Sequence, residues 1–283
     1  MFLEKHATLK RSGWRDELTI RKHLLPRFKN YYLSAIDQKK IVDYKAVRAG
    51  QVKKATVNRE LALLKTLYNK AIAWGMADKN PVKGVEFFKE DNQIAHVLTE
   101  PEETRLLEAC MGSLAYLRPL IILALNTGLR RGELLSLKWS NVSLSFRQLV
   151  VEATNCKSKK RLLIPINARA YAVLVELKAQ ATSDYVFRKT NGQPYNRETL
   201  RDHFEKLYKQ VGIEDLRLHD LRHSFATRLS AKGVDIVTIK DLLGHSTITM
   251  TMRYAHSSSQ RQAVDLLCDA AETEKSVTKV LHG

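Results

Sequence analysis

The sequence contains few cysteines. Only three occur among its 283 residues, at the widely separated positions Cys110, Cys156 and Cys268. An odd number without paired spacing argues against a disulfide scaffold and against a zinc knuckle. The cysteine pattern fits a protein of the reducing cytoplasm.

Long apolar runs are also missing. The longest, at residues 120–125, falls well short of the roughly 18 apolar residues that a membrane helix needs, and we expect it in a buried core. The N-terminal residues Met1–His6 lack the apolar centre of a signal peptide. The sequence has no internal repeat, no low-complexity segment and no phosphate-binding P-loop.

Acidic residues are outnumbered by basic ones. There are 47 Lys and Arg against 30 Asp and Glu, a formal net charge of +17, and residues 1–98 alone hold 20 basic and 10 acidic side chains. Such an excess suits a polyanion, with nucleic acid as the first candidate and an anionic membrane surface as the second. The first third of the chain is therefore predicted to bind phosphates.

Apolar residues at helical spacing predict an all-helical region up to residue 75. We expect a helix over residues 14–33 that Pro26 interrupts, a short amphipathic helix over 36–47, and a longer helix capped by Thr56 and ended by Gly75. Residues 82–95 look like a charged connector. The predicted domains are residues 1–91 and 92–283, and Thr99 with Glu102 forms a capping box early in the second.

The second domain is predicted to be helical with one β-hairpin. The apolar helix at 114–125 ends near Gly128, whose freedom to turn would hold Arg130 at a helix junction. Strand patterns at 149–151 and 162–164 flank a basic tip, a short strand is expected at 185–187, and helices at 168–180, 196–210, 234–243 and 261–270. The fold class is mainly α with a small β-hairpin (α+β). Solvated arginines and lysines are the alternative interpretation of the turn and the tip.

Residues 218–227 carry an unusual group of side chains. His219 and Arg222, three residues apart on a helix, share a face and suit a phosphate. His219 and His223 share a face too, and their spacing loosely echoes a zinc-protease helix. A metal-dependent hydrolase would need a glutamate where Asp220 stands, and Arg222 would repel the cation.

Four segments, taken in order, carry a family resemblance. Residues 127–133 (TGLRRGE) and 219–223 (HDLRH) resemble the two arginine boxes of the tyrosine recombinases of the phage integrase family, and residues 242–245 with 254–256 resemble the box that ends in the nucleophile. Lys157, eight residues before Pro165, stands where the family has a hairpin lysine. Residues 56–61 are similar to the family's helical core-binding domain, so the resemblance covers almost the whole chain.

The resemblance implies a site and a reaction. Its catalytic residues would be Arg130, Lys157, His219, Arg222, His245 and Tyr254, supported by Glu133. Its DNA-binding residues would be Lys53, Lys54, Thr56, Asn58, Arg59, Lys159 and Lys160. The family cleaves and rejoins DNA strands through a covalent 3′-phosphotyrosine and a Holliday junction, for example to integrate or excise a mobile element. The covalent bond conserves the energy of the phosphodiester, so we expect no metal, ATP or other cofactor.

Elementary chemistry supports these roles. Each arginine offers two parallel N–H donors to the phosphate oxygens, on which negative charge concentrates in the transition state. The Tyr254 phenol, with an ordinary pKa of about 10, must lose its proton as it attacks. His219 is the candidate to move that proton, Lys157 is by resemblance the acid for the leaving 5′ oxygen, and His245 would hydrogen-bond the phosphate.

The expected partners follow from this reaction. They are double-stranded recombination sites, a homotetramer on synapsed DNA in which the 261–270 helix packs into a neighbour, and candidate accessory directionality proteins, but no membrane. We expect the protein in the cytoplasm, associated with the nucleoid. No room remains for an N-terminal arm-binding domain, which indicates a simpler recombinase or a shortened chain. A non-catalytic DNA-binding regulator and a type IB topoisomerase are the alternatives, disfavoured by the complete catalytic set and by the compact helical N-terminal domain respectively.

Overall fold

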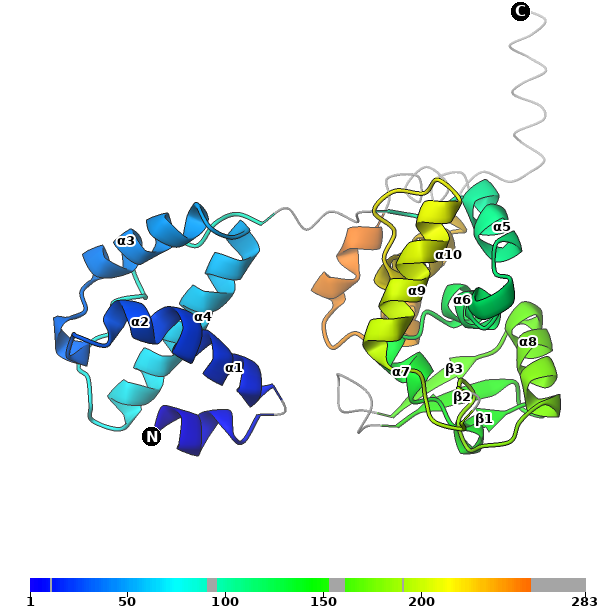
Figure 1. Ribbon diagram of the computed structural model, residues 1–283, viewed down its shortest axis with the longest axis horizontal. Helices are drawn as coiled ribbons and strands as arrows, with labels where there is room; N and C mark the ends of the chain where they lie inside the picture. Colours follow the sequence, from blue (N-terminus) through cyan, green and yellow to red (C-terminus); the bar gives the residue numbers. More distant parts are fainter. Residues whose placement is uncertain (11, 91–95, 153–160, 190, 256–283) are drawn as a thin grey trace, which may run out of the picture. The chain divides into compact units, whose positions relative to one another are not determined.

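The computed structural model describes residues 1–10, 12–90, 96–152, 161–189 and 191–255 (Figure 1). The chain divides into two compact units, Met1–Asn92 and Gln93–Gly283. Within the described residues the fold is mainly helical with a three-stranded sheet, which confirms the predicted fold class.

The first unit is built around its longest helix, α4 (Lys54–Ala73). Apolar side chains recur along α4 at helical spacing and are buried, among them Val57, Leu61, Leu64 and Tyr68. They pack with side chains of α2 (Leu25–Phe28) and α3 (Gln38–Ala49) and of the segments around these helices. The helix α1 (Gly13–Thr19) precedes α2 in the chain. The unit thus has a core of its own.

Three details of the first unit differ from the prediction. Pro26 does not end the helical segment. The helix α1, the π-helical turn Ile20–Leu24 and α2 follow one another without a gap, and Pro26 lies in the first turn of α2, where proline is tolerated. The helix α4 begins two residues before Thr56, with Lys53 at its N-cap and no side-chain cap. The expected connector starts later, since Val82 and Val85 are buried in the unit's core.

A buried ion pair joins α3 to α4. The carboxylate of Glu60 accepts from Arg48 Nη2 at 2.6 Å and Nε at 2.9 Å, and from the hydroxyl of Tyr44 at 2.6 Å. Because Glu60 is only 3% exposed, these donors replace the water that the carboxylate loses on folding.

The second unit packs its helices around α6 (Leu117–Thr127), which contacts both α8 (Ala168–Ala179) and α10 (Leu218–Ala231). The other α-helices among the described residues of this unit are α5 (Glu100–Glu108), α7 (Arg131–Leu135), α9 (Arg197–Gln210) and α11 (Ile236–Leu243). The predicted capping box is present at α5, where Thr99 and Glu102 bind each other's backbone N–H groups. Gln93–Gly283 therefore has a separate apolar core, formed largely by α6 and its neighbours.

The sheet has the order β1-β2-β3 and is antiparallel. Strands β2 (Gln148–Val151) and β3 (Leu162–Pro165) form the predicted hairpin, with Leu149 opposite Ile164. Strand β1 (Val142–Ser143) was not predicted, because two residues are too few for a periodic pattern. The prediction of a strand at residues 185–187 was wrong, because Tyr185 makes only an isolated β-bridge to Lys138.

Candidate active site

A glycine turn places Arg130 at the start of α7. The helix α6 ends at Gly128, whose φ of 64° lies in the left-handed region. A Cβ atom at this position would lie 2.5 Å from Cδ1 of Phe225 on α10, so both the backbone conformation and the packing require glycine. Two residues later Arg130 occupies the N-cap of α7.

Glu133 holds Arg130 in place. Its two carboxylate oxygens accept from the backbone N–H and from Nη1 of Arg130, each at 2.8 Å. Glu133 is buried, whereas the side chain of Arg130 keeps 19% of its surface exposed. The carboxylate therefore orients the guanidinium from the protein side and leaves part of it accessible.

Arg222 lies inside the second unit, 2% exposed, on α10. Nη1 donates to the carbonyl of Gly128 at 2.7 Å, and Nη2 donates to the carbonyl of Leu243 at 2.5 Å. These carbonyls belong to the ends of α6 and α11, so Arg222 connects the turn that precedes Arg130 with the turn that precedes His245.

A second glycine turn places His245. Gly244 ends α11 with a φ of 59°, and a Cβ atom there would lie 2.9 Å from Leu162 of β3. His245 Nδ1 lies 2.8 Å from the hydroxyl of Thr251. Burial, followed by the charges of Arg222 and Arg130, lowers the pKa of His245 to about 4. The imidazole is therefore neutral at pH 7.

Tyr254 is buried in a small apolar cluster with Ala226, Ile239 and Leu243. It is 1% exposed, and its hydroxyl lies 2.5 Å from Nδ1 of His223. Burial raises the pKa of Tyr254, while the nearby charges of Arg222, Arg253 and Arg130 act in the opposite direction. The cations thus reduce the cost of forming a phenolate at this position.

Electrostatic effects link five of the six predicted catalytic residues. The charges of Arg130 and Arg222 act on His219, His245 and Tyr254, although of these five only His219 and Arg222 share an element, α10. His219 is exposed on one side, yet the protein packed around it lowers its pKa, and Arg222 adds to this effect. The predicted Lys157, and also Lys159 and Lys160, lie outside the described residues.

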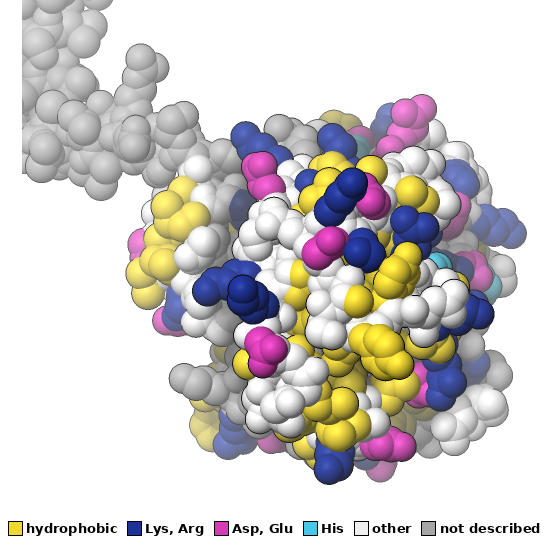
Figure 2. Space-filling view, turned by 90° about the vertical axis from the view of Figure 1, so that its left-hand side faces the viewer, with side chains coloured by type: hydrophobic (Ala, Val, Ile, Leu, Met, Phe, Trp, Pro, Cys, Tyr) yellow, Lys and Arg dark blue, Asp and Glu magenta, His cyan; other side chains and the backbone are white. Residues whose placement is uncertain are grey.

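The predicted DNA-binding residues of the first unit differ in their surroundings. Lys53, Lys54 and Arg59 are exposed and Thr56 is half-buried. Asn58 is buried instead: its amide donates to the carbonyl of Phe88 at 2.8 Å and accepts from the N–H of Phe88 at 2.9 Å. These two bonds hold the segment around Phe88 against α4. We therefore withdraw Asn58 from the predicted DNA-binding residues. Figure 2 shows Lys and Arg side chains spread among apolar and acidic ones on the visible face.

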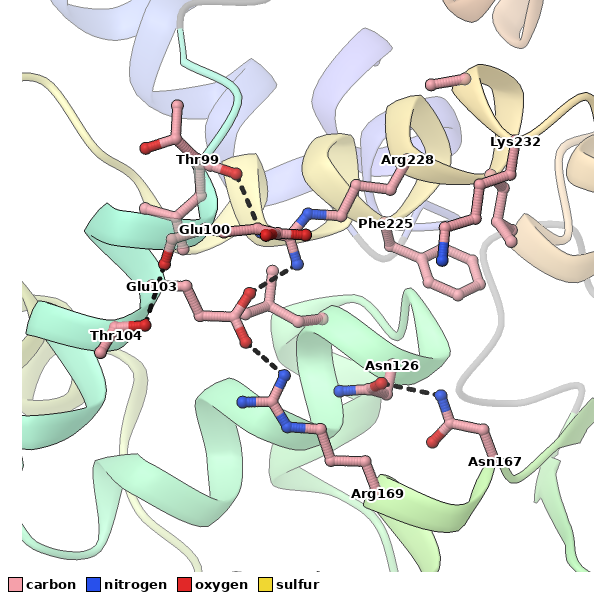
Figure 3. A pocket seen from close by; sticks show the side chains of 14 residues that line it. Thr99, Glu100, Glu103, Thr104, Asn126, Asn167, Arg169, Phe225, Arg228 and Lys232 are labelled. Carbon is pink, nitrogen blue, oxygen red and sulfur yellow. Dashed lines mark hydrogen bonds and ion pairs between the residues drawn. The ribbon is translucent and has the colours of Figure 1, made fainter.

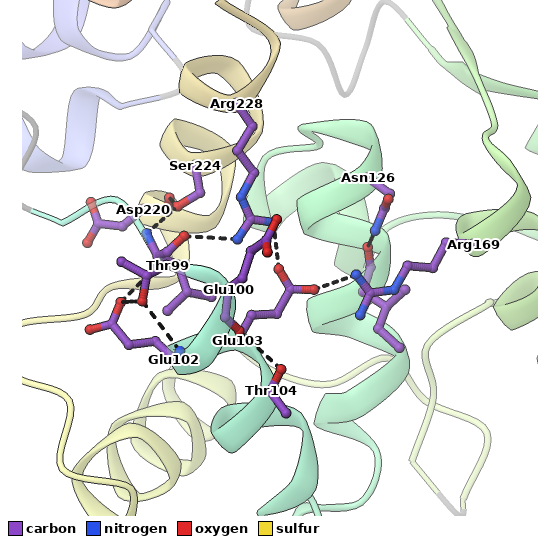
Figure 4. Close-up of polar contacts among 12 residues, drawn as sticks. Thr99, Glu100, Glu102, Glu103, Thr104, Asn126, Arg169, Asp220, Ser224 and Arg228 are labelled. Atoms are coloured by element: carbon purple, nitrogen blue, oxygen red, sulfur yellow. Dashed lines mark hydrogen bonds and ion pairs between the residues drawn. The ribbon is translucent and has the colours of Figure 1, made fainter. Parts of the chain in front are cut away.

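The sequence analysis missed the roles of two residues in the second unit, His223 and Glu103. The sequence analysis considered His223 only for its spacing from His219, but its Nδ1 atom lies 2.5 Å from the hydroxyl of Tyr254. Glu103 on α5 was not singled out, yet it binds Arg169 of α8 and Arg228 of α10, each at 2.5 Å (Figure 4). The spacing of His219 and His223 was a signal for the first; no local pattern indicates the second.

The Glu103 network forms one wall of a pocket of about 680 Å³ between α5, α6, α8 and α10 (Figure 3). Among the residues that the structure describes, none of the predicted catalytic residues lines this pocket. Its two arginines are held by Glu103 and bridge three helices, which is a packing arrangement. The candidate active site is therefore the cluster of Arg130, Arg222 and Tyr254 instead of this pocket.

The described residues form neither a metal site nor a membrane-spanning helix. No group of three or more His, Cys, Asp or Glu side chains comes together there as a metal site would require. Nor does any helix among them have the length and apolar character needed to cross a membrane.

Both parts of the chain match sequence models of known protein families. The sequence model of the phage integrase family matches residues 96–261, and that of the phage integrase N-terminal domain matches residues 1–89. The chain is 34% identical over 208 residues to the integrase of Haemophilus phage HP1, a match that spans 72% of this chain and 56% of that integrase. It is 27% identical over 254 residues to the tyrosine recombinase XerC of Staphylococcus epidermidis strain RP62A, spanning 84% and 85% of the two chains.

Solved structures share the fold. A lambda integrase dimer bound to a COC′ core site superimposes with a TM-score of 0.78 at 22% identity, over 90% of this chain and 94% of that one. The Tn1549 transposon integrase in complex with transposon right end DNA gives the same TM-score and identity over 91% and 94%. With the family match over more than half of its length, the chain belongs to the phage integrase family and is a tyrosine recombinase.

Proposed function

We propose that this protein cleaves and rejoins DNA at specific sites through a covalent 3′-phosphotyrosine and a Holliday junction, to integrate or excise a mobile element. The observation that carries the proposal is the grouping of Arg130, His219, Arg222, His245 and Tyr254 in one electrostatic cluster. Its cations suit a phosphodiester, and its tyrosine suits attack on phosphorus.

Each residue has a role in the proposed reaction. Arg130 and Arg222 bind the non-bridging oxygens, and Glu133 orients Arg130 for this purpose. Tyr254 attacks the phosphorus as its phenol proton leaves through His219, and His245 donates a hydrogen bond to the phosphate. Lys157, assigned by resemblance alone, protonates the departing 5′ oxygen. Attack by the 5′ hydroxyl of another strand reverses the step and completes the exchange.

We assign DNA binding in the first unit to Lys53, Lys54 and Arg59, with Thr56 at their centre in the sequence. All three basic side chains are exposed near the start of α4. Their charges would neutralise backbone phosphates without reading the sequence, as most protein–phosphate contacts do. Lys159 and Lys160 remain proposed contacts of the hairpin tip.

The experiment uses nicked duplexes that carry candidate sites. The protein is mixed with them in the presence of a chelator, and a denaturing gel separates covalent protein–DNA adducts. We expect an adduct with the wild-type chain and none with Tyr254→Phe. Adduct formation by Tyr254→Phe would overturn the assignment of the nucleophile, and loss of the wild-type adduct on chelation would contradict metal-free cleavage.

The proposed assembly is a tetramer on synapsed DNA, because strand exchange between two duplexes uses four cleavage sites. We assign contact with the neighbouring protomer to residues 261–270, which lie outside the described residues. Deletion of residues 261–283 should reduce recombination of two sites more than cleavage of one strand. Equal loss of both activities would contradict this assignment. We also propose that the protein acts in the nucleoid with accessory directionality proteins.

A further inference from the structure

His223 stands out among the buried side chains of the second unit that the proposed reaction leaves without a role. It follows Arg222 directly on α10 and is 6% exposed. Its Nδ1 atom lies 2.5 Å from the hydroxyl oxygen of Tyr254, which is 31 residues away in the sequence. A buried imidazole therefore contacts the atom that would attack the DNA.

The backbone and the ring of Tyr254 are held separately. Its N–H donates to the carbonyl of Thr251 at 2.9 Å, and its carbonyl accepts from the hydroxyl of Ser230 at 2.5 Å. These bonds fix the main chain but leave the rotation of the phenol ring open. The contact with His223 acts on the hydroxyl end of the ring and so restricts this rotation.

The protonation states favour a hydrogen bond from the phenol to the imidazole. Burial, then the charges of His219 and Arg253, lowers the pKa of His223 to about 4, so its ring is neutral at pH 7. Burial raises the pKa of Tyr254, so the phenol keeps its proton and its O–H donates a hydrogen bond to Nδ1 of His223. His219 packs edge-on against His223, with 4.7 Å between the ring centroids, and limits the movement of that ring.

We propose that His223 is a positioning residue for the nucleophile: through Nδ1 it holds the hydroxyl of Tyr254 in the orientation from which the phenol approaches the phosphate. The proposal rests on the proposed function and adds to it the side chain that controls the nucleophile before attack. Holding a reacting group in place raises the rate of the chemical step without raising the affinity for the substrate.

The test compares two substitutions of similar size. His223→Asn keeps an amide oxygen near the position of Nδ1, whereas His223→Leu has no hydrogen-bond acceptor. On nicked duplexes under single-turnover conditions, we expect His223→Leu to slow adduct formation by about 10–100-fold and His223→Asn to recover most of the rate. The affinity for DNA should stay within about twofold for both variants, because a positioning role acts on the reaction step.

The chain offers a matched control. The hydroxyl of Tyr116 lies 3.0 Å from Nδ1 of His203 on α9, a second pair of the same two residue types in the same unit. His203→Leu should lower the thermal midpoint without changing the rate of adduct formation. If His203→Leu slows the adduct as much as His223→Leu does, or if His223→Asn and His223→Leu are equally slow, the role of His223 is structural and the proposal fails.

A measurement without DNA separates this proposal from the proposed function. In a double-mutant cycle on the thermal midpoint, the loss caused by Tyr254→Phe should disappear in the His223→Leu background. Additive losses would overturn the contact itself. If the cycle shows coupling and the wild-type chain forms no adduct, the proposed function fails while the contact stands. If the wild type forms the adduct and His223→Leu forms it equally fast, only the positioning role fails.

Discussion

The two units each bury a tyrosine whose hydroxyl is hydrogen-bonded, but the charges around the two rings differ. In the first unit Tyr44, 2% exposed, donates to the carboxylate of Glu60 at 2.6 Å. In the second unit Tyr254, 1% exposed, contacts the imidazole of His223 at 2.5 Å. Burial alone therefore cannot distinguish a packing tyrosine from a nucleophile.

The neighbouring charges make the distinction. Burial raises the pKa of both tyrosines, and the hydrogen bond and charge of Glu60 raise that of Tyr44 further. At Tyr254 the charges of Arg222, Arg253 and Arg130 instead offset part of the increase that burial causes, although the pKa stays raised. The charge of Glu60 thus adds to the cost of a phenolate at Tyr44, whereas the arginines reduce that cost at Tyr254. The surroundings of Tyr44 thus stabilise the protonated side chain, and the arginines near Tyr254 make the loss of its proton easier than burial alone would allow.

The sharpest test exchanges each tyrosine for phenylalanine. Tyr254→Phe should reduce adduct formation by about 10⁴-fold or more, because no other group replaces the attacking oxygen. Tyr44→Phe should leave the rate of adduct formation within about twofold and lower the free energy of unfolding by about 2 kcal/mol, through the lost bond to a buried carboxylate. Single-turnover gels and chemical denaturation measure the two effects. An equal effect of both substitutions on cleavage would remove the distinction between the sites.

Replacing a cation near Tyr254 should have the next largest effect. Arg222→Lys keeps the charge but loses the planar pair of donors, and we expect adduct formation to slow by about 10²–10³-fold. Arg169→Lys is the matched control, because Arg169 pairs with Glu103 away from the cluster. Its cleavage rate should stay near that of the wild type. An unchanged rate in Arg222→Lys would mean that point charge alone suffices.

In the first unit, removal of charge should affect stability instead of cleavage. Glu60→Gln leaves Arg48 without its buried ion-pair partner and weakens the bond to Tyr44, so we expect a loss of about 3 kcal/mol in the free energy of unfolding. Denaturation followed by Trp14 and Trp74, the two tryptophans of this unit, measures the change. The cleavage rate at saturating DNA should not change; a large decrease would indicate that this ion pair serves the reaction.

Mild acid should weaken the second unit. The pKa values of His223 and His245 are lowered to about 4 in the folded state, whereas histidines of the unfolded chain titrate near 6.5. The unfolded state then binds more protons, so stability is complete above pH 6.5 and is lost as the pH falls toward 4. We expect a loss of about 1–2 kcal/mol by pH 5.5, after allowance for the half-buried position of His245.

Trp139 reports on this unit once Trp14 and Trp74 are replaced by phenylalanine. Denaturation of this variant at pH 7.5 and pH 5.5 measures the loss. His223→Asn should reduce the dependence of the free energy of unfolding on pH, since one of the histidines with a lowered pKa is then absent. A free energy of unfolding that is larger at pH 5.5 than at pH 7.5 would contradict the lowered pKa values of the two histidines.

Local patterns were sufficient to predict most of the architecture. The period of apolar residues indicated the long helix α4, the Thr99–Glu102 pair indicated the start of α5, and alternating strands indicated the β2–β3 hairpin. These features depend on side chains within a few residues of one another. The predicted start of α4 was wrong by three residues, because a capping side chain is worth only about 1 kcal/mol and helix-forming residues before Thr56 extend the helix without it.

The sequence by itself determined the family, the helical and hairpin elements, and the residue types of the candidate active site, because motif order and spacing carry this information. Only the tertiary structure decided which side chains meet. Asn58 is buried against Phe88, Glu103 binds two arginines 66 and 125 residues away, and His223 contacts Tyr254 across 31 residues. Such pairs depend on how helices pack, and packing is a property of the whole core, not of any local pattern.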